Sequence, residues 1–449
     1  MDMDPALISI IVFLVVYATI AFDLINKAVA TFSGVSILVL LNIISTQTLD
    51  SNITKNSYLP QAIMLIDYET IMLLFGMMVI INVLKKSGFF VLIAIYIAEL
   101  TRGKPIKILI LFSFVTGAMS AFLDNITTIL IIIPLIIELT KGLGLNPKIY
   151  ILSQVIISNI SGAATLIGGS QNIIIGSKAE LSFNQFVLNM GPPTIIIFFV
   201  ILIFIWLINK NEYKSIDKNI LQLFTINLLL KKIQHNFINT NINKPIIIKS
   251  IILLAITFIL FITQSITHLT PGAIALSMGI FLVLYTNSNI ESILEDIDWS
   301  SLMFFVGLFI LVGTLEHYQV IEWIANNIFN NLGENPYINV LIIQWASGLI
   351  SGFIDNTPFT ITMIPIIDIL NNSNPILQNL LWWSLALGTS LGSNITILGA
   401  SANIISIGIA KKAGINISFL EFMKLGSIIS FISLLISSIY LIFRVSILL

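Results

Sequence analysis

Two aspartates lie deep within long apolar stretches of the chain. Asp124 is the only charged residue in the stretch 108–137, and Asp355 is the only one in the stretch 335–367. A carboxylate within such a stretch is costly in a membrane, so it marks an ion or substrate path by default. A carboxylate there can bind a hard cation such as Na⁺ or take up and release a proton. The sequence therefore predicts ion chemistry at both positions.

The stretch around each aspartate occurs twice. An asparagine follows both Asp124 and Asp355, and the separation between these two aspartates is called the repeat offset below. The same offset relates other residues whose identity would not repeat by chance in this composition: Asp67 and Asp298, Gly76 and Gly307, Gly117 and Gly348, Pro134 and Pro365, Ser153 and Ser384, Asn172 and Asn403. The pattern indicates an internal duplication.

Composition places both copies in a membrane. The chain has 449 residues, 57% of them hydrophobic and 10% charged, with a mean hydropathy of +1.01. Apolar runs of membrane-spanning length recur throughout, without the alternation of lipid-facing strands, which predicts helices. A net charge of −1 gives no reason to expect a nucleic-acid partner. The chain has no cysteine and three scattered histidines, so we expect no cofactor and no structural metal.

Lysine and arginine placement predicts how the segments cross the membrane. No lysine or arginine lies between Lys249 and Lys411, whereas residues 85–148 of the first copy carry Lys85, Lys86, Arg102, Lys104, Lys107, Lys141 and Lys148. All seven fall on the cytoplasmic side, as the positive-inside rule requires, under two conditions. Residues 89–100 must lie along the interface, and the Asp-Asn element must be a re-entrant hairpin.

The predicted fold is therefore an all-α polytopic membrane protein with two inverted repeats. We expect repeats at 1–208 and 246–449, joined by a cytoplasmic linker at 209–245. Each repeat has five crossings, one of them a broken helix, together with an interfacial helix and a re-entrant hairpin. The acidic start of the chain is unlike a signal peptide, so the first helix is expected to be retained. Both termini are predicted on the outer side of the cell (inner) membrane.

Inverted repeats with discontinuous helices are typical of secondary transporters. Non-helical backbone at membrane depth lines a cavity or is buried in protein, and the two hairpin turns and the two broken helices provide it here. Half-helix N-termini favour anions, and hydroxyl, carbonyl and carboxylate oxygens suit Na⁺, including a Na⁺ near Asp124 and Asp355. The candidate binding residues are Asp124, Asn125, Thr127, Thr165, Gly168, Ser170, Asn172, Asp355, Asn356, Thr357, Asn394, Thr396, Gly399, Ser401 and Asn403.

Simpler interpretations exist for several of these residues. The two aspartates could cap the second helix of each hairpin, although the neighbouring asparagines could do this without a buried charge. The glycines at 168, 169 and 399 could serve close packing alone. Their clustering with serine and asparagine at matched positions favours binding.

At these residues the sequence resembles the ion transporter superfamily. The likeness is greatest to its branch of arsenite pumps, NhaD-type sodium/proton antiporters and melanosomal P proteins, which often carry a citrate-transporter-like domain. Residues 122–128, Phe-Leu-Asp-Asn-Ile-Thr-Thr, and 353–360, Phe-Ile-Asp-Asn-Thr-Pro-Phe-Thr, are similar to its two hairpin motifs. Residues 159–168 and 391–403 are similar to its two broken-helix loops. The resemblance implies a homodimer and elevator-type movement of the hairpins against a scaffold.

The first loop departs from the family pattern. The family's Gly-Asp-Pro-Pro-Asn is Gly-Gly-Ser-Gln-Asn at residues 168–172, so the loop carries no fixed negative charge. The ligands expected there are then neutral: Thr165, Ser170 and Asn172, with Thr396, Ser401 and Asn403 in the second loop. Neutral donors favour an oxyanion substrate and leave the coupling cation to the aspartates.

These observations predict a secondary active transporter rather than an enzyme. The expected cargo is a small anion such as arsenite, a related oxyanion or a carboxylate, coupled to H⁺ or Na⁺. A sodium/proton antiporter is the alternative, because two membrane aspartates suit cation exchange equally well. An intramembrane aspartyl protease is a distant alternative, because the Gly-x-Gly-Asp context of such enzymes is missing at residues 352–355. The predicted partners are the lipid bilayer and the transported ion.

Overall fold

The computed structural model describes residues 4–21, 24–44, 61–101, 104–210, 242–324, 335–373 and 379–448. Within these residues the secondary structure is helical, with no strand. In the described part of the chain, seven helices are long and apolar enough to cross a membrane: α4, α6, α7, α10, α12, α16 and α22. The prediction of an all-α membrane protein is confirmed. Most of the predicted linker lies outside the described residues.

The helices of the first half are α1 (Pro5–Ala21), α2 (Lys27–Leu40), α3 (Gln61–Met64), α4 (Tyr68–Lys86), α5 (Phe89–Thr101), α6 (Pro105–Phe122), α7 (Asn125–Gly142), α8 (Pro147–Gly162), α9 (Ser170–Lys178) and α10 (Phe183–Ile208). Those of the second half are α12 (Lys244–Ile262), α13 (Gln264–Thr267), α14 (Pro271–Thr286), α15 (Ile290–Glu295), α16 (Trp299–His317), α17 (Val320–Ile324), α18 (Pro336–Ser351), α19 (Asn356–Ser373), α20 (Leu380–Gly392), the 3₁₀ turn η3 (Ile397–Gly399), α21 (Ser401–Lys412) and α22 (Phe419–Leu448).

The helix bounds follow the same repeat offset as the sequence. Both ends of α4 and α16 are separated by this offset, as are both ends of α7 and α19. The first residues of α6 and α18, and of α9 and α21, are related in the same way. The duplicated residues therefore begin corresponding helices in both halves. The inverted arrangement of the two repeats stays a prediction.

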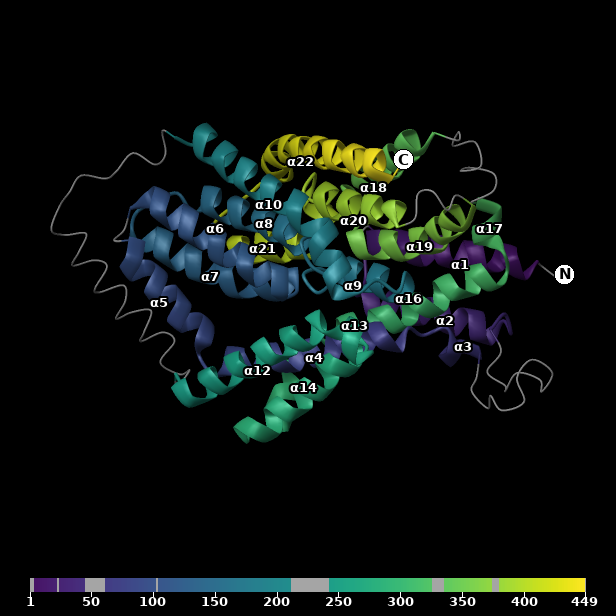
Figure 1. Cartoon of the computed structure of the whole chain (residues 1–449), viewed down its shortest axis with the longest axis horizontal. Coiled ribbons are helices and arrows are strands. Elements are labelled where there is room, and N and C mark those ends of the chain that lie inside the picture. The colour runs from purple at the N-terminus through teal and green to yellow at the C-terminus, as the bar shows by residue number, and fades with distance from the viewer. Residues whose placement is uncertain are drawn as a thin grey trace.

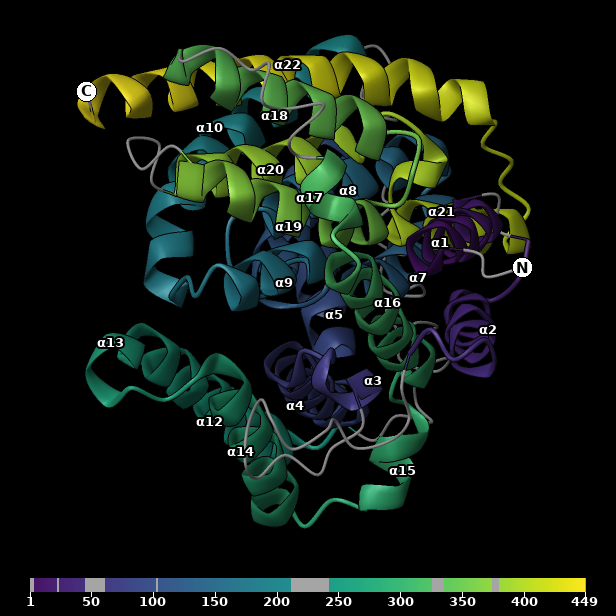
Figure 2. The ribbon, with the colours of Figure 1, turned by 90° about the vertical axis from the view of Figure 1, so that its right-hand side faces the viewer.

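The helices form two groups, and in Figure 2 the pair α4 and α14 of the first group lies apart from the hairpin helices, while α16 runs between the two groups. In the first group α4 packs on α14 and α2 packs on α16, so each pair joins the two halves of the chain. The second group contains the two hairpins, α6–α7 and α18–α19, with the broken helices α8–α9 and α20–α21 and the long helices α10 and α22. Here too the halves interlock, because α7 packs on α21 and α9 packs on α19 (Figure 1).

Small residues fix each hairpin closely against its broken helix. A Cβ on Gly392 of α20 would lie 2.0 Å from the carbonyl oxygen of Gly348 in α18, and one on Gly388 would lie 2.4 Å from the carbonyl oxygen of Gln344. In the first half, Thr116 of α6 donates to Gln154 of α8 at 2.7 Å. Small residues let helix backbones approach in a membrane, where apolar side chains alone give little association. The hairpin turns are thereby held at the broken-helix loops.

Candidate functional site

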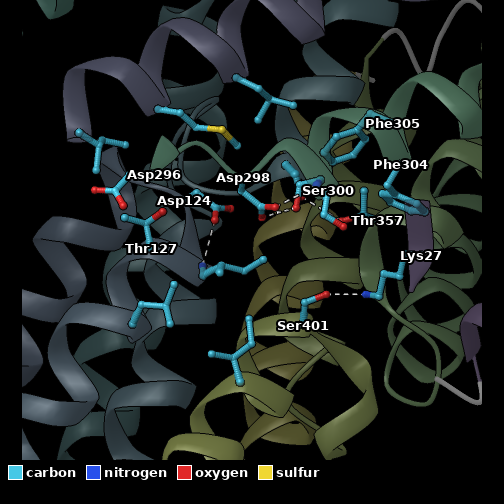
Figure 3. Close-up of a pocket in the computed structure, with 18 of the residues that line it drawn as sticks. Lys27, Asp124, Thr127, Asp296, Asp298, Ser300, Phe304, Phe305, Thr357 and Ser401 are labelled. Atoms are coloured by element: carbon cyan, nitrogen blue, oxygen red, sulfur yellow. Dashed lines mark hydrogen bonds between the residues drawn. The ribbon is translucent and has the colours of Figure 1, made fainter. Parts of the chain in front are cut away.

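A cavity of about 510 Å³ lies where the two groups of helices meet. Both hairpin turns, the starts of α9 and α21, the start of α2, the second half of α4 and the start of α16 line it. Figure 3 shows its polar side chains converging from these elements. Its ionisable lining residues are Lys27, Lys85, Asp124, Asp296, Asp298 and Asp355.

Both aspartates of the hairpin turns cap the helix that follows. Asp124 accepts a hydrogen bond from the backbone N–H of Ile126 at 3.1 Å, and Asp355 accepts one from that of Thr357 at 3.1 Å. This is the arrangement that an N-cap makes, and it satisfies one free N–H of each helix. Capping therefore accounts for one bond at each aspartate, and the remaining bonds differ between them.

Asp355 is engaged by a cation from outside its own repeat. The Lys27 ammonium of α2 donates to Oδ2 of Asp355 and, at 2.6 Å, to the hydroxyl of Ser401. Ser401 in turn donates to the same carboxylate oxygen. The side chain of Asp355 is 8% exposed and that of Lys27 is 24% exposed, so the pair is poorly hydrated. Hydrogen bonds between charged groups in such a setting are short and strong.

Asp124 has no such partner. Among the described residues, no lysine or arginine forms an ion pair with it. Its side chain is half-buried and faces the cavity, near Asp296 and Asp298 (Figure 3). Asp296 is paired with Lys86 at 3.4 Å, and Asp298 accepts from the backbone N–H of Ser301 at 3.0 Å. Asp124 and Asp298 are therefore the acids on this side of the cavity that form no ion pair among the described residues.

The broken helices resume earlier than the sequence predicts. The sequence pattern extends the interruption to residues 172 and 403, but α9 begins at Ser170 and α21 begins at Ser401. Neither N-cap residue, Gly169 or Ala400, makes a side-chain capping bond, because neither has a hydroxyl, amide or carboxylate. Ser170 bonds to the hydroxyl of Thr357 at 2.9 Å and so joins α9 to the second hairpin. Ser170, Ser401 and Thr357 line the cavity.

Two matched threonines fasten each broken-helix loop to its hairpin. Thr165 donates to the carbonyl oxygen of Ala121, and Thr396 donates to that of Gly352 at 2.6 Å. Each hydroxyl also accepts from the loop backbone, at 3.1 Å from Gly168 N and at 3.1 Å from Leu398 N. Both threonines are buried and fully engaged, so their contacts are structural.

Two matched asparagines close the loops. The amide of Asn172 donates to the carbonyl oxygen of Gly162 at 3.1 Å and of Thr165 at 2.8 Å. The amide of Asn403 donates to the carbonyl oxygen of Ser393 at 2.9 Å and of Thr396 at 3.0 Å. Both side chains are fully buried, and each joins the end of one half-helix to the start of the next.

A chain of buried amides connects the two halves at their centre. Asn159 donates to Asn394 and Asn403, at 2.8 Å in both cases, and accepts from Asn125 at 3.4 Å. Asn125 also accepts from Ser120 at 2.5 Å. A fully connected network of this kind fixes one geometry, because breaking any member leaves buried polar atoms without partners.

The matched glycines, Gly168 and Gly399, lie in close contact with the backbone of neighbouring segments. A Cβ on Gly168 would lie 2.5 Å from the Gly162 carbonyl oxygen and 2.7 Å from that of Ser120. A Cβ on Gly399 would lie 2.4 Å from the Ser393 carbonyl oxygen and 3.0 Å from that of Ser351. The close-packing interpretation therefore has a direct structural basis at both positions.

The predicted site residues thus divide into two sets. Lining the cavity are Asp124, Thr127, Ser170, Asp355, Thr357 and Ser401. Behind them, outside its lining, lie Asn125, Thr165, Gly168, Asn172, Asn356, Asn394, Thr396, Gly399 and Asn403. The second set holds the first in place through the hydrogen bonds and close approaches described above.

Comparison with known proteins gives the family of this arrangement. Residues 17–388 match the family described as citrate transporter, which includes both hairpins and the first part of the second broken helix. The chain belongs to the citrate transporter family. A 46 kDa membrane protein of Mycobacterium leprae is 34% identical over 97% of this chain and 98% of its own length. An uncharacterized transporter of Mycobacterium tuberculosis is 33% identical, with the same coverage of both chains.

More distant matches agree with the family. The human P protein is 29% identical over 95% of this chain, which spans 58% of that protein. Among solved structures, the YdaH transporter of Alcanivorax borkumensis, described as having an unusual topology, matches with a TM-score of 0.60. It covers 93% of this chain and 98% of its own at 12% identity, which supports the fold alone.

Sequence reasoning missed Lys27, Asp296 and Asp298 as lining residues of this family member. The importance of Asp298 could have been predicted from the sequence, because it matches Asp67 in the repeat. The two residues are the N-caps of the corresponding helices α16 and α4. Asp296 has no matched acid, since residue 65 is a leucine. Lys27 stands 328 residues from Asp355, and nothing in the duplication pointed to it.

Proposed function

We propose that this protein is a secondary active transporter that moves a small ion and couples it to Na⁺ or H⁺ bound at Asp124. The observation that carries the proposal is the half-buried Asp124 carboxylate, which faces the cavity and forms no ion pair among the described residues. A carboxylate in this setting gains from binding Na⁺ or a proton, because either one neutralises its charge.

The first candidate cargo is a small anion, such as arsenite, a related oxyanion or a carboxylate. The starts of α9 and α21 support it, because Ser170 and Ser401 face the cavity at helices without a side-chain cap. Helix N-termini favour anions through their free N–H groups and positive dipole ends. In this proposal the anion lies between Ser170 and Ser401, and the cation lies at Asp124.

Sodium/proton antiport is the second candidate, and the charge of the cavity supports it. Four aspartates and two lysines line the cavity; Lys27 is bound to Asp355, and Asp296 is paired with Lys85 and Lys86, which leaves Asp124 and Asp298 without an ion pair among the described residues. An excess of carboxylates raises the local concentration of cations and lowers that of anions. The two candidates therefore differ in what moves, and both use Asp124.

A second, smaller cavity supports alternating access between the two sides. It measures about 180 Å³, and Phe309, Val312, Gly313 and Glu316 of α16 line it. The repeat offset relates these four residues to Met78, Ile81, Asn82 and Lys85 of α4, which line the large cavity. Matched surfaces thus border one wide and one narrow cavity, as expected of an inverted repeat that opens on one side at a time.

Transport by purified protein in liposomes tests the function. We expect uptake of one member of an anion panel, including citrate and arsenite, to depend on an imposed Na⁺ or pH gradient. In the antiport case, a Na⁺ gradient alone should drive H⁺ movement, detected with an internal pH dye. Absence of every such flux from protein that is folded and inserted would contradict the proposal.

A further inference from the structure

Lys27 makes the two halves differ at the start of α2 and of its counterpart α14. It is the first residue of α2, and its N-cap Asn26 accepts from Ser300 of α16 at 3.1 Å. In the other half, the start of α14 donates a backbone N–H to Glu69 of α4, which the repeat offset matches to Ser300. Both helix starts therefore contact repeat-matched positions of their neighbours, with donor and acceptor exchanged. Pro271 is the first residue of α14, and Lys27 is the first residue of α2.

The ammonium of Lys27 fills the place that a bound cation would take at the second hairpin. Oδ2 of Asp355 receives Lys27 and Ser401, and Oδ1 receives the backbone N–H of Thr357 at 3.1 Å. The Ser401 hydroxyl is also occupied, since it accepts from Lys27 and donates to Asp355. The ammonium is thus bound by a carboxylate oxygen and a hydroxyl oxygen. A monovalent cation would be coordinated by the same oxygens.

At the first hairpin there is a matching carboxylate and a matching serine hydroxyl, but no lysine binds them among the described residues. Asp124 matches Asp355, and Ser170 matches Ser401, but Ser170 bonds to Thr357 rather than to Asp124. Among the described residues no side-chain cation touches Asp124. One hairpin therefore carries a built-in cation, and the other leaves its carboxylate to the cavity.

We propose that Lys27 permanently takes the cation position of the second hairpin, so that the protein binds one coupling cation, at Asp124, instead of two. This rests on the proposed function of Asp124. Lys27 sets the number of cations per cycle and is a specificity-determining residue. The other ionisable groups around Asp355 are Tyr17 of α1 and, across the cavity, Asp124, Asp296 and Asp298.

The test counts cations bound per chain in the full-length protein. Because the chain has no cysteine, Lys27→Cys creates a single reactive thiol. Bound radioactive Na⁺ is measured at saturation, and if the wild type uses H⁺, potentiometric titration gives the corresponding count. We expect one cation in the wild type and two in Lys27→Cys. Treatment with aminoethyl methanethiosulfonate, which returns an ammonium, should restore one, whereas the uncharged methyl reagent should leave two.

The controls separate this inference from the proposed function. The double variant Lys27→Cys/Asp124→Asn should bind one cation, at Asp355. An equal count in wild type and Lys27→Cys, before and after the reagents, would overturn the inference. An equal count in wild type and Asp124→Asn would instead overturn the proposed function.

A second variant keeps the test decisive if Lys27→Cys does not fold. Asp355→Asn retains Lys27 and the cap, and its cation count should stay at one. A count lowered by one would show that Asp355 binds the coupling cation beside Lys27, which contradicts the proposal.

Discussion

The two hairpin turns share their Asp-Asn pair, its position in the repeat and its cap, yet only the second aspartate is paired with a cation among the described residues. Asp124 and Asp355 each accept a backbone N–H at 3.1 Å, from Ile126 and Thr357. Asp355 is additionally bound by Lys27 and Ser401, and Asp124 faces the cavity near two further acids. The shared Asp-Asn pair therefore builds the same turn twice, and a distant helix decides whether its carboxylate is available.

The difference arises where the duplication is least regular. The elements α4, α7 and α9 reappear at the repeat offset as α16, α19 and α21. The earlier helices do not, since α2 begins at Lys27 and α14 begins at Pro271, which is farther along the chain than the repeat offset would place it. The divergence of α2 and α14 leaves the hairpin turns unchanged but alters which side chains contact them. The difference between the two turns therefore comes from α2 and α14, not from the hairpins themselves.

Removing the charge of Asp124 should have the largest effect on transport. Asp124→Asn keeps the size and the cap, because asparagine caps about as well as aspartate. We expect the apparent affinity for the coupling cation, measured from uptake in liposomes, to fall at least about tenfold, which corresponds to about 1.4 kcal/mol of binding free energy. The protein should remain folded and inserted.

Full, gradient-dependent activity in Asp124→Asn would show that the aspartate serves only as a cap. The difference between the two turns would then have no bearing on coupling. Asp67→Asn is a matched control, because Asp67 also caps a helix, α4, and lies outside the lining of the large cavity.

Replacing each matched glycine by alanine tests whether the two broken-helix loops are equally constrained. In Gly168→Ala and Gly399→Ala, the new Cβ would meet backbone carbonyl oxygens at 2.5 Å and 2.4 Å. Backbone cannot move aside easily, so we expect each change to destabilise the protein by about 1–3 kcal/mol or more. Thermal unfolding in detergent measures this. The control is Gly408→Ala in α21, where the Cβ meets nothing within 4 Å.

Similar losses at both glycines would support equivalent roles for the two loops. A loss at one position alone would show that the broken helices are not equally constrained. In the control, stability should be unchanged or rise by about 0.5–1 kcal/mol, as expected when alanine replaces glycine within a helix.

Most of the fold could be predicted from the sequence, because apolar length and the duplicated pairs specify helices and turns locally. The turn at Asp124 and the break before Ser170 are encoded in short stretches, and the structure has both. Inversion of the repeats, the re-entrant course of the hairpins and the orientation of the termini stay predictions.

The contacts of the site were harder to predict, because they depend on side-chain direction across distant elements. The sequence predicts that Asn172 offers its amide to a substrate, whereas the amide donates to the carbonyl oxygens of its own loop. Only the fold shows which face of α9 is turned to the cavity. Likewise, the Lys27–Asp355 pair joins residues 328 positions apart, which local pattern cannot reveal.

Removing the charge of Asp355 should have a smaller effect on coupling than removing that of Asp124. In Asp355→Asn the Lys27 ammonium loses its counter-ion, and about 1–3 kcal/mol of stability should be lost, less than for a fully buried pair because Lys27 is 24% exposed. Uptake should slow while its dependence on Na⁺ or pH persists. Complete loss of that dependence would make the two aspartates equivalent.

The smallest difference is expected between the two loop asparagines. Asn172→Ala and Asn403→Ala each leave buried loop carbonyl groups without a donor, which costs about 1–3 kcal/mol. Asn403 should cost more, because its Oδ1 also accepts from Asn159 at 2.8 Å, whereas Oδ1 of Asn172 has no hydrogen-bond partner within the described residues. Thermal unfolding and transport affinity are measured for both variants. Since neither amide lines the cavity, stability should fall while the affinity for the transported ion changes little. A loss of affinity without a loss of stability would instead place these amides in the binding site and make the loops, rather than the hairpin turns, the points of substrate contact.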